Sequence, residues 1–129
     1  MRFLVMVQSN ATSLAHWETL TDEQRTAFGM AHYALTDSLM EEGVLVVSGG
    51  LMGPEAGRRV SVRDGELVST DGPFAEVKEH IAGFYLVECD DLAAAEQIAA
   101  RVPDAAFNHV EVRPLWDPRA WEADDAATS

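Results

Sequence analysis

The sequence predicts an α+β fold of the ferredoxin-like, split β-α-β type with an inserted β-hairpin. Its strand-type and helix-type segments follow the order β-α-β, hairpin, β-α-β, which is the order of that motif. Two short strand-type segments flank Asp64-Gly65, the commonest short-range signal of a hairpin turn. Residues 81–89 form a nearly continuous apolar run, which is typical of a central strand.

The first half of the predicted fold is a strand, a long helix and a second strand. Residues 2–8 have the pattern of a strand, and residues 10–13 form a polar break. The helix is expected to begin at Thr21, which has a glutamine three positions later, and to end at Gly43. Residues 44–47 form the second strand. One apolar stripe of the helix consists of Phe28, His32, Leu35 and Leu39.

The second half begins with the hairpin and ends with the last strand. The hairpin strands are expected at residues 59–63 and 66–70, before the central strand. Asp90-Asp91 is expected to cap a second helix, which Pro103 closes. Residues 108–115 form the last strand, in which two valines oppose His109, Glu111 and Arg113.

This pattern describes one domain that is expected to dimerise. We assign residues 1–115 to the domain and residues 116–129 to a C-terminal tail, which we expect to be partly disordered. Two helices can cover only one face of the sheet, whereas several strands are apolar on both faces. The uncovered face would expose a large apolar patch, so we expect a homodimer that packs sheet against sheet.

The charge of the chain excludes some classes of partner. The formal net charge is −13, with only 9 lysines and arginines in 129 residues. Binding to nucleic acid or to an anionic membrane requires a basic surface, so neither partner is expected. The single cysteine, Cys89, is consistent with a reducing compartment. The N-terminal apolar run is too short for a signal peptide or a membrane span, and a cytoplasmic location is expected.

Residues 70–85, which include Asp71-Gly72-Pro73-Phe74, resemble the signature of the DGPF branch of the YCII-related family. The resemblance extends over the N-terminal strand, residues 43–46, residues 63–65 and residues 110–114. It implies a dimeric α+β barrel. Some members are similar to small enzymes that act on cyclic metabolites, and some are encoded beside extracytoplasmic-function sigma factors. A His–Asp pair is the active site inferred for related proteins. The histidine corresponds to His32, but the acidic partner has no single counterpart here.

His32 and Asp71 are the candidate catalytic residues. His32 interrupts an apolar helical stripe, where a half-buried imidazole can act as a general acid or base. It can equally be a core histidine that is hydrogen-bonded to the backbone. Asp71 could orient His32 or bind substrate, or it could only stabilise the turn before Gly72 and Pro73. We predict that His32 and Asp71 share a cleft.

Three residues of the family-like segment are candidate substrate contacts: Phe74, Lys78 and Glu79. Lys78 is the only lysine in the chain and is flanked by carboxylates, so it could position an anionic or carbonyl substrate. A solvated charged loop is the alternative. The polar face of the last strand could likewise line the cleft or only face solvent.

The function predicted from these residues is cofactor-free acid–base catalysis on a small metabolite, of the isomerase, dehydratase or cyclase type. No histidine pair has the spacing of a known metal motif, so neither a metal nor a cofactor is expected. The alternative is a non-catalytic binding or accessory module that serves a sigma-factor regulator, since an acidic surface could engage a basic protein.

Overall fold

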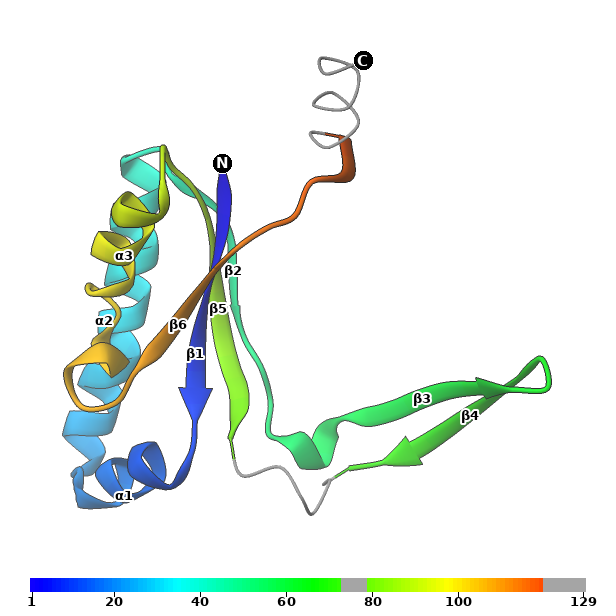
Figure 1. Ribbon diagram of the computed structural model, residues 1–129. Coiled ribbons are helices and arrows are strands. Elements are labelled where there is room, and N and C mark those ends of the chain that lie inside the picture. Colours follow the sequence, from blue (N-terminus) through cyan, green and yellow to red (C-terminus); the bar gives the residue numbers. More distant parts are fainter. Residues whose placement is uncertain (73–78, 120–129) are drawn as a thin grey trace, which may run out of the picture.

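The computed structural model describes residues 1–72 and 79–119, which form a four-stranded antiparallel sheet with helices on one face and a projecting hairpin (Figure 1). The strand order is β2-β5-β1-β6. Both neighbours of β1 run antiparallel to it, and β5 separates β1 from β2. This arrangement confirms the predicted split β-α-β fold class. The sheet strands are β1 (Arg2–Ser9), β2 (Leu45–Gly50), β5 (His80–Glu88) and β6 (Val110–Pro114).

The long helix α2 (Asp22–Glu41) begins and ends where the sequence predicts. Thr21 and Gln24 form a capping box, in which each side chain accepts a hydrogen bond from the other residue's backbone N–H, at 3.1 and 2.9 Å. Gly43 has a φ of 75°, a conformation that glycine adopts without a Cβ clash, and it follows the C-cap of the helix.

A short helix, α1 (Ala11–Thr19), follows β1 where only a polar break was predicted. Asn10 caps it by accepting a hydrogen bond from the Ser13 N–H, and the Ser13 hydroxyl accepts one from the Asn10 N–H. No residue of α1 is buried, so its sequence lacks the apolar stripe that would have indicated a helix.

The second predicted helix is observed as α3, and an unpredicted 3₁₀ turn follows it. Asp91 caps α3 (Leu92–Ala99) by accepting a hydrogen bond from the Ala94 N–H at 2.8 Å, as predicted. A 3₁₀ turn, η2 (Pro103–Ala106), then carries the chain toward β6. Proline fits at the start of such a turn because its missing N–H needs no partner there. A second 3₁₀ turn, η1 (Pro54–Ala56), lies between β2 and the hairpin.

The core lies between the sheet and the helices. Alternate residues of β1 and β5 face the helices, with Val5 directly opposite Tyr85. From α2, Leu35 and Leu39 pack against them, as the helical stripe predicts. The remaining buried core residues are Phe3, Val7, Val87, Ala95, Ile98, Ala99 and Val102.

A β-bulge interrupts the pairing of β1 with β5. Val7 lies opposite Gly83, but Gln8 lies opposite Ile81, so Ala82 has no partner in this register. A bulge inserts one extra residue into a strand and re-aims the side chains around it. As a result Ala82 packs against the core on the helix side, and Ile81 is an exposed residue.

The hairpin consists of β3 (Arg58–Arg63) and β4 (Glu66–Asp71), and it projects away from the sheet (Figure 1). Asp64 and Gly65 both have positive φ, at 50° and 78°, as a type I′ turn requires. Every residue of both strands is exposed. The predicted hairpin is thus confirmed.

The sheet face opposite the helices is largely apolar at its centre. Leu4 lies opposite Leu86, and Met6 lies opposite Phe84. Val47 continues this apolar face onto β2 and is 48% exposed. Residues 120–129, which contain most of the predicted tail, lie outside the described residues. None of the described helices is long and apolar enough to cross a membrane.

We predict that this apolar face is the interface of a homodimer. Light scattering at low micromolar concentration should give twice the chain mass of 14.1 kDa. Leu86→Glu should shift the mass toward the monomer, because it would bury a carboxylate in the interface. Leu92→Glu, on the helix side of the fold, is the matched control and should leave the mass unchanged. A monomer mass for the wild-type protein would contradict the prediction.

Candidate functional site

His32 is paired with a carboxylate that lies 72 residues away in the sequence. Its Nε2 lies 2.7 Å from Oδ1 of Asp104 in η2. The His32 side chain is 26% exposed, whereas that of Asp104 is 8% exposed. The pair therefore reaches solvent through the imidazole, and the carboxylate lies behind it.

Burial of Asp104 makes this pairing energetically important. An ionised carboxylate removed from water is costly unless it is paired and hydrogen-bonded. Its backbone carbonyl also accepts hydrogen bonds from the N–H groups of Phe107 and Asn108, which fixes the turn. The carboxylate is thus held rigidly against the middle of α2.

Tyr85 occupies the other ring nitrogen of His32. Its hydroxyl lies 2.6 Å from Nδ1, and the two rings are nearly parallel, with centroids 6.0 Å apart. Desolvation by burial raises the pKa of Tyr85, and the negative charge of Asp104 adds to this effect. A hydrogen bond with Thr36 acts in the opposite direction. The phenol is therefore held in its neutral form across the physiological range.

These contacts indicate which atoms carry the protons when His32 is neutral. An ionised carboxylate can only accept a hydrogen bond, so Nε2 of a neutral His32 must carry the ring proton and donate it to Asp104. Nδ1 is then an acceptor, and the Tyr85 hydroxyl donates to it. The site is a continuous chain from carboxylate through imidazole to phenol, similar in logic to a catalytic triad.

A cavity of about 590 Å³ opens beside this chain of residues. Its volume falls in the range of small-molecule sites. Glycines provide part of its wall on the sheet side, and a Cβ added to Gly83 would lie 3.0 Å from the Gly49 carbonyl oxygen. Side chains of larger residues there would reduce the cavity. Other lining residues are Phe28, Tyr33, Thr36 and Phe84.

Asp71 is not the partner of His32, so the predicted pairing of these two residues is wrong. Asp71 ends β4 in the projecting hairpin, its side chain is 75% exposed, and it forms an ion pair with Arg58. Both ring nitrogens of His32 are occupied by other residues. The family-like sequence around Asp71 therefore marks the base of the hairpin.

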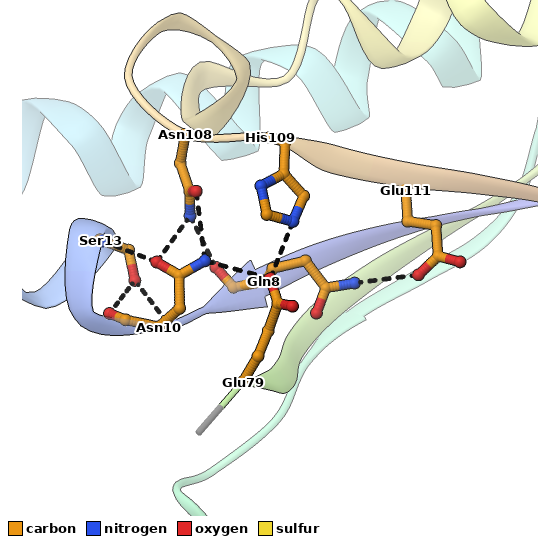
Figure 2. Close-up of polar contacts among 7 residues, drawn as sticks. All are labelled: Gln8, Asn10, Ser13, Glu79, Asn108, His109 and Glu111. Carbon is orange, nitrogen blue, oxygen red and sulfur yellow. Dashed lines mark hydrogen bonds and ion pairs between the residues drawn. The ribbon is translucent and has the colours of Figure 1, made fainter. Parts of the chain in front are cut away.

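Glu79 belongs to a polar cluster at the start of α1 (Figure 2). Its Oε1 lies 2.8 Å from Nε2 of His109 and accepts a hydrogen bond from the Asn10 amide at 3.1 Å. It does not line the 590 Å³ cavity. The predicted contacts Phe74 and Lys78 lie outside the described residues.

The polar residues of β6 lie on the sheet face opposite the helices, with Glu111 opposite Met6 and Arg113 opposite Leu4. Val110 and Val112 pack against the core, as the alternating pattern predicts. Glu111 accepts hydrogen bonds from Gln8, at 3.4 Å, and from Arg113, at 2.7 Å. His109, Glu111 and Arg113 do not line the 590 Å³ cavity.

Sequence reasoning missed Asp104 and Tyr85. Asp104 follows a proline, and an aspartate at such a position is common in turns. Its position between Val102, which is buried, and Phe107, which is half-buried, is the feature that distinguishes it from an ordinary turn residue. Tyr85 lies within the apolar central strand. Its alternation with Val87 would have placed it on the helix side, facing His32.

The described residues give little support for a metal site or for a reactive thiol. Residues 1–72 and 79–119 contain no group of three or more His, Cys, Asp or Glu arranged to hold a metal ion. The pKa of the Cys89 thiol is raised, mainly by burial and to a smaller extent by Asp90 and Asp91. This direction argues against an activated thiolate at Cys89.

Comparison with known proteins gives a family, a partial relative and a structural neighbour. A 53-residue segment is 45% identical to the uncharacterized protein R00369 of Rhizobium meliloti (strain 1021), covering 40% of this chain and 43% of that protein. The match thus spans less than half of the relative's length.

The structural neighbour is the 5-chloro-2-hydroxyhydroquinone dehydrochlorinase TftG from Burkholderia phenoliruptrix AC1100, solved in complex with 2,5-dihydroxybenzoquinone. The TM-score is 0.52 at 18% identity, over 93% of this chain and 98% of TftG. At that identity the likeness shows the α+β fold alone.

The family match covers nearly the whole chain. The model of the YCII-related domain matches residues 1–119, which include every described helix and strand. It therefore covers both halves of the split β-α-β fold, the hairpin and the site around His32. The chain belongs to the YCII-related domain family.

Proposed function

We propose that the protein is a cofactor-free acid–base enzyme that catalyses an isomerisation or an elimination on a small cyclic metabolite. The observation that carries this proposal is the chain of hydrogen bonds from Asp104 through His32 to Tyr85 beside an open cavity. The open cavity would give a substrate access to this chain, which a histidine that is only hydrogen-bonded within the core does not provide.

Tyr85 is the member of this chain that meets the substrate. Both ring nitrogens of His32 are engaged, so a proton that enters the chain reaches the phenol oxygen first. As Tyr85 takes a proton from the substrate, its own proton passes to Nδ1 of His32. Asp104 stabilises the resulting imidazolium, and return of the proton by the same route completes the cycle.

The burial of Asp104 favours the charged intermediate of this relay. Its side chain is 8% exposed and lies behind the imidazole, where the low local dielectric constant strengthens its attraction to an imidazolium. Phe28 and His32 form a T-shaped contact, with ring centroids 5.1 Å apart and an interplanar angle of 71°, which helps to hold the imidazole in place. The relay thus lowers the energy of a transferred proton.

The dehydrochlorinase with a similar fold supports a hydroxylated ring as the substrate class. Loss of HCl from such a ring requires that one hydroxyl proton move to the carbon that bears chlorine, and that a second hydroxyl proton be released as chloride leaves, which gives a hydroxyquinone. A residue chain that accepts a proton and returns it to the substrate provides the first transfer, and it can accept the second proton and pass it to solvent. Elimination from a substituted hydroquinone is therefore the first reaction to be tested.

Replacement of the relay residues should abolish this activity. With 5-chloro-2-hydroxyhydroquinone under anaerobic conditions, the wild-type protein should accelerate chloride release. His32→Gln and Asp104→Asn should each lower kcat/KM by about 10²–10⁴-fold, because both keep a hydrogen bond but interrupt proton transfer. Chloride release is followed with an ion-selective electrode.

The matched control is His109→Gln, which replaces a histidine on the surface of the sheet, away from the cavity. It should retain the wild-type rate. A folded His32→Gln variant with wild-type kcat/KM would refute the relay, and no acceleration by the wild-type protein would refute elimination from this class of ring.

The raised pKa of Tyr85 provides a second test. Because the folded state holds this proton more tightly, its ionisation should occur above the ordinary value of 10.0. The protonated Tyr85 hydroxyl therefore contributes to the free energy of unfolding in full below the ordinary pKa, and this contribution is lost as the pH rises through the raised pKa of the folded state. Absorbance at 295 nm follows tyrosine ionisation, and circular dichroism at the same pH verifies folding.

The chain has two tyrosines, so the assignment is simple. Tyr85→Phe should remove the part of the absorbance rise that is displaced above the ordinary tyrosine range, and should lower kcat/KM by at least about 10²-fold. Tyr33→Phe should leave that part in place. Survival of that part in Tyr85→Phe would show that Tyr85 does not have the raised pKa.

A further inference from the structure

A second, smaller cavity adjoins the proposed active site. Its volume is about 260 Å³, and it shares Phe28, Ala82 and Asp104 with the 590 Å³ cavity. Phe28 and the bulge residue Ala82 therefore stand between the two spaces, and Asp104 borders both. A volume this small is below that of typical ligand sites, so it fits one part of a ligand better than a whole one.

The walls of this space are aromatic. The rings of His16 and Phe107 are stacked, with centroids 3.8 Å apart. Phe28 lies 5.9 Å from Phe107 and 6.1 Å from Trp17, measured between ring centroids. We call this space the aromatic pocket, and it is completed by Gln8, Ser9, Ser13 and Leu14.

Helix α1 forms one wall of the aromatic pocket and is fixed at both ends. At its start, Asn10 and Asn108 exchange amide hydrogen bonds at 3.2 and 3.3 Å, as Figure 2 shows. At its end, Arg25 donates two hydrogen bonds to the Trp17 carbonyl, and its guanidinium lies 4.9 Å from the Trp17 ring centroid. A helix without buried residues is thus held over a cavity by polar contacts instead of by core packing.

We propose that the aromatic pocket is a second subsite of the same cleft, which binds an apolar ring carried by the substrate. The hydroxylated ring would lie beside Tyr85 in the larger cavity, and the second ring would lie past Phe28, between Trp17 and Phe107. Aromatic rings favour such edge-to-face and offset contacts. This inference rests on the proposed function for the position of the first ring.

The charges of the lining residues specify the ligand further. Within the described chain, neither cavity is lined by a lysine or an arginine, and both include the Asp104 carboxylate. A phosphate or carboxylate group would find no counter-charge from those residues. The described walls of the two cavities thus favour an aryl-substituted phenol as the ligand class.

Phenol and 4-phenylphenol are the probes, and isothermal titration calorimetry measures their affinities. The wild-type protein should bind 4-phenylphenol at least about tenfold more tightly than phenol, because the second ring is buried in the aromatic pocket. Leu14→Trp places a larger side chain in that pocket and should remove this preference while phenol binding remains. Leu14 is 57% exposed, so the fold should accept the change.

Leu92→Trp is the matched control, since Leu92 lies on α3 and lines neither cavity. It should keep the preference for 4-phenylphenol. Equal affinities in the wild-type protein, a preference that survives in Leu14→Trp, or no binding of either probe would overturn the subsite. The two proposals fail separately: a wild-type rate in His32→Gln refutes the relay, whereas the ligand preference is measured without turnover.

Discussion

The buried carboxylate of Asp104 is the constraint on which the site depends. Its side chain is buried, and Nε2 of His32, 2.7 Å from Oδ1, is the hydrogen-bonding partner that such a carboxylate needs. That requirement fixes the tautomer of the imidazole and directs Nδ1 toward Tyr85. It also fixes η2 against α2, so that the turn between α3 and β6 is part of the site and not only a connection. One pairing therefore couples a loop, a helix and a strand.

The core leucines of α2 and His32 lie on the same face of the helix. Leu35 and Leu39 are buried in the core, and His32 lies on the same stripe one turn earlier. A rotation of α2 that changed the packing of the leucines would also move the imidazole away from Tyr85. The sheet–helix core thus fixes the position of the imidazole that we propose transfers protons.

The parts of the fold that local signals determine could be predicted from the sequence. The capping box at Thr21, the Asp64-Gly65 turn and the alternation in β6 each act over a few residues, and each is observed. Helix α1 was missed because it buries nothing. The partner of His32 was missed because tertiary structure brings Asp104 to it across 72 residues, and no local pattern encodes that contact.

The bulge at Ala82 has a consequence for how such a fold can diversify. Without it, regular alternation would turn Ala82 to the far face of the sheet and bring Ile81 to the helix side, beside Phe28 and Asp104. A branched side chain would then occupy the space that Ala82 borders in both cavities. A change in the register of this central strand could therefore alter the size of both cavities while every helix stayed in place. Ligand size in this architecture could thus change without a new loop.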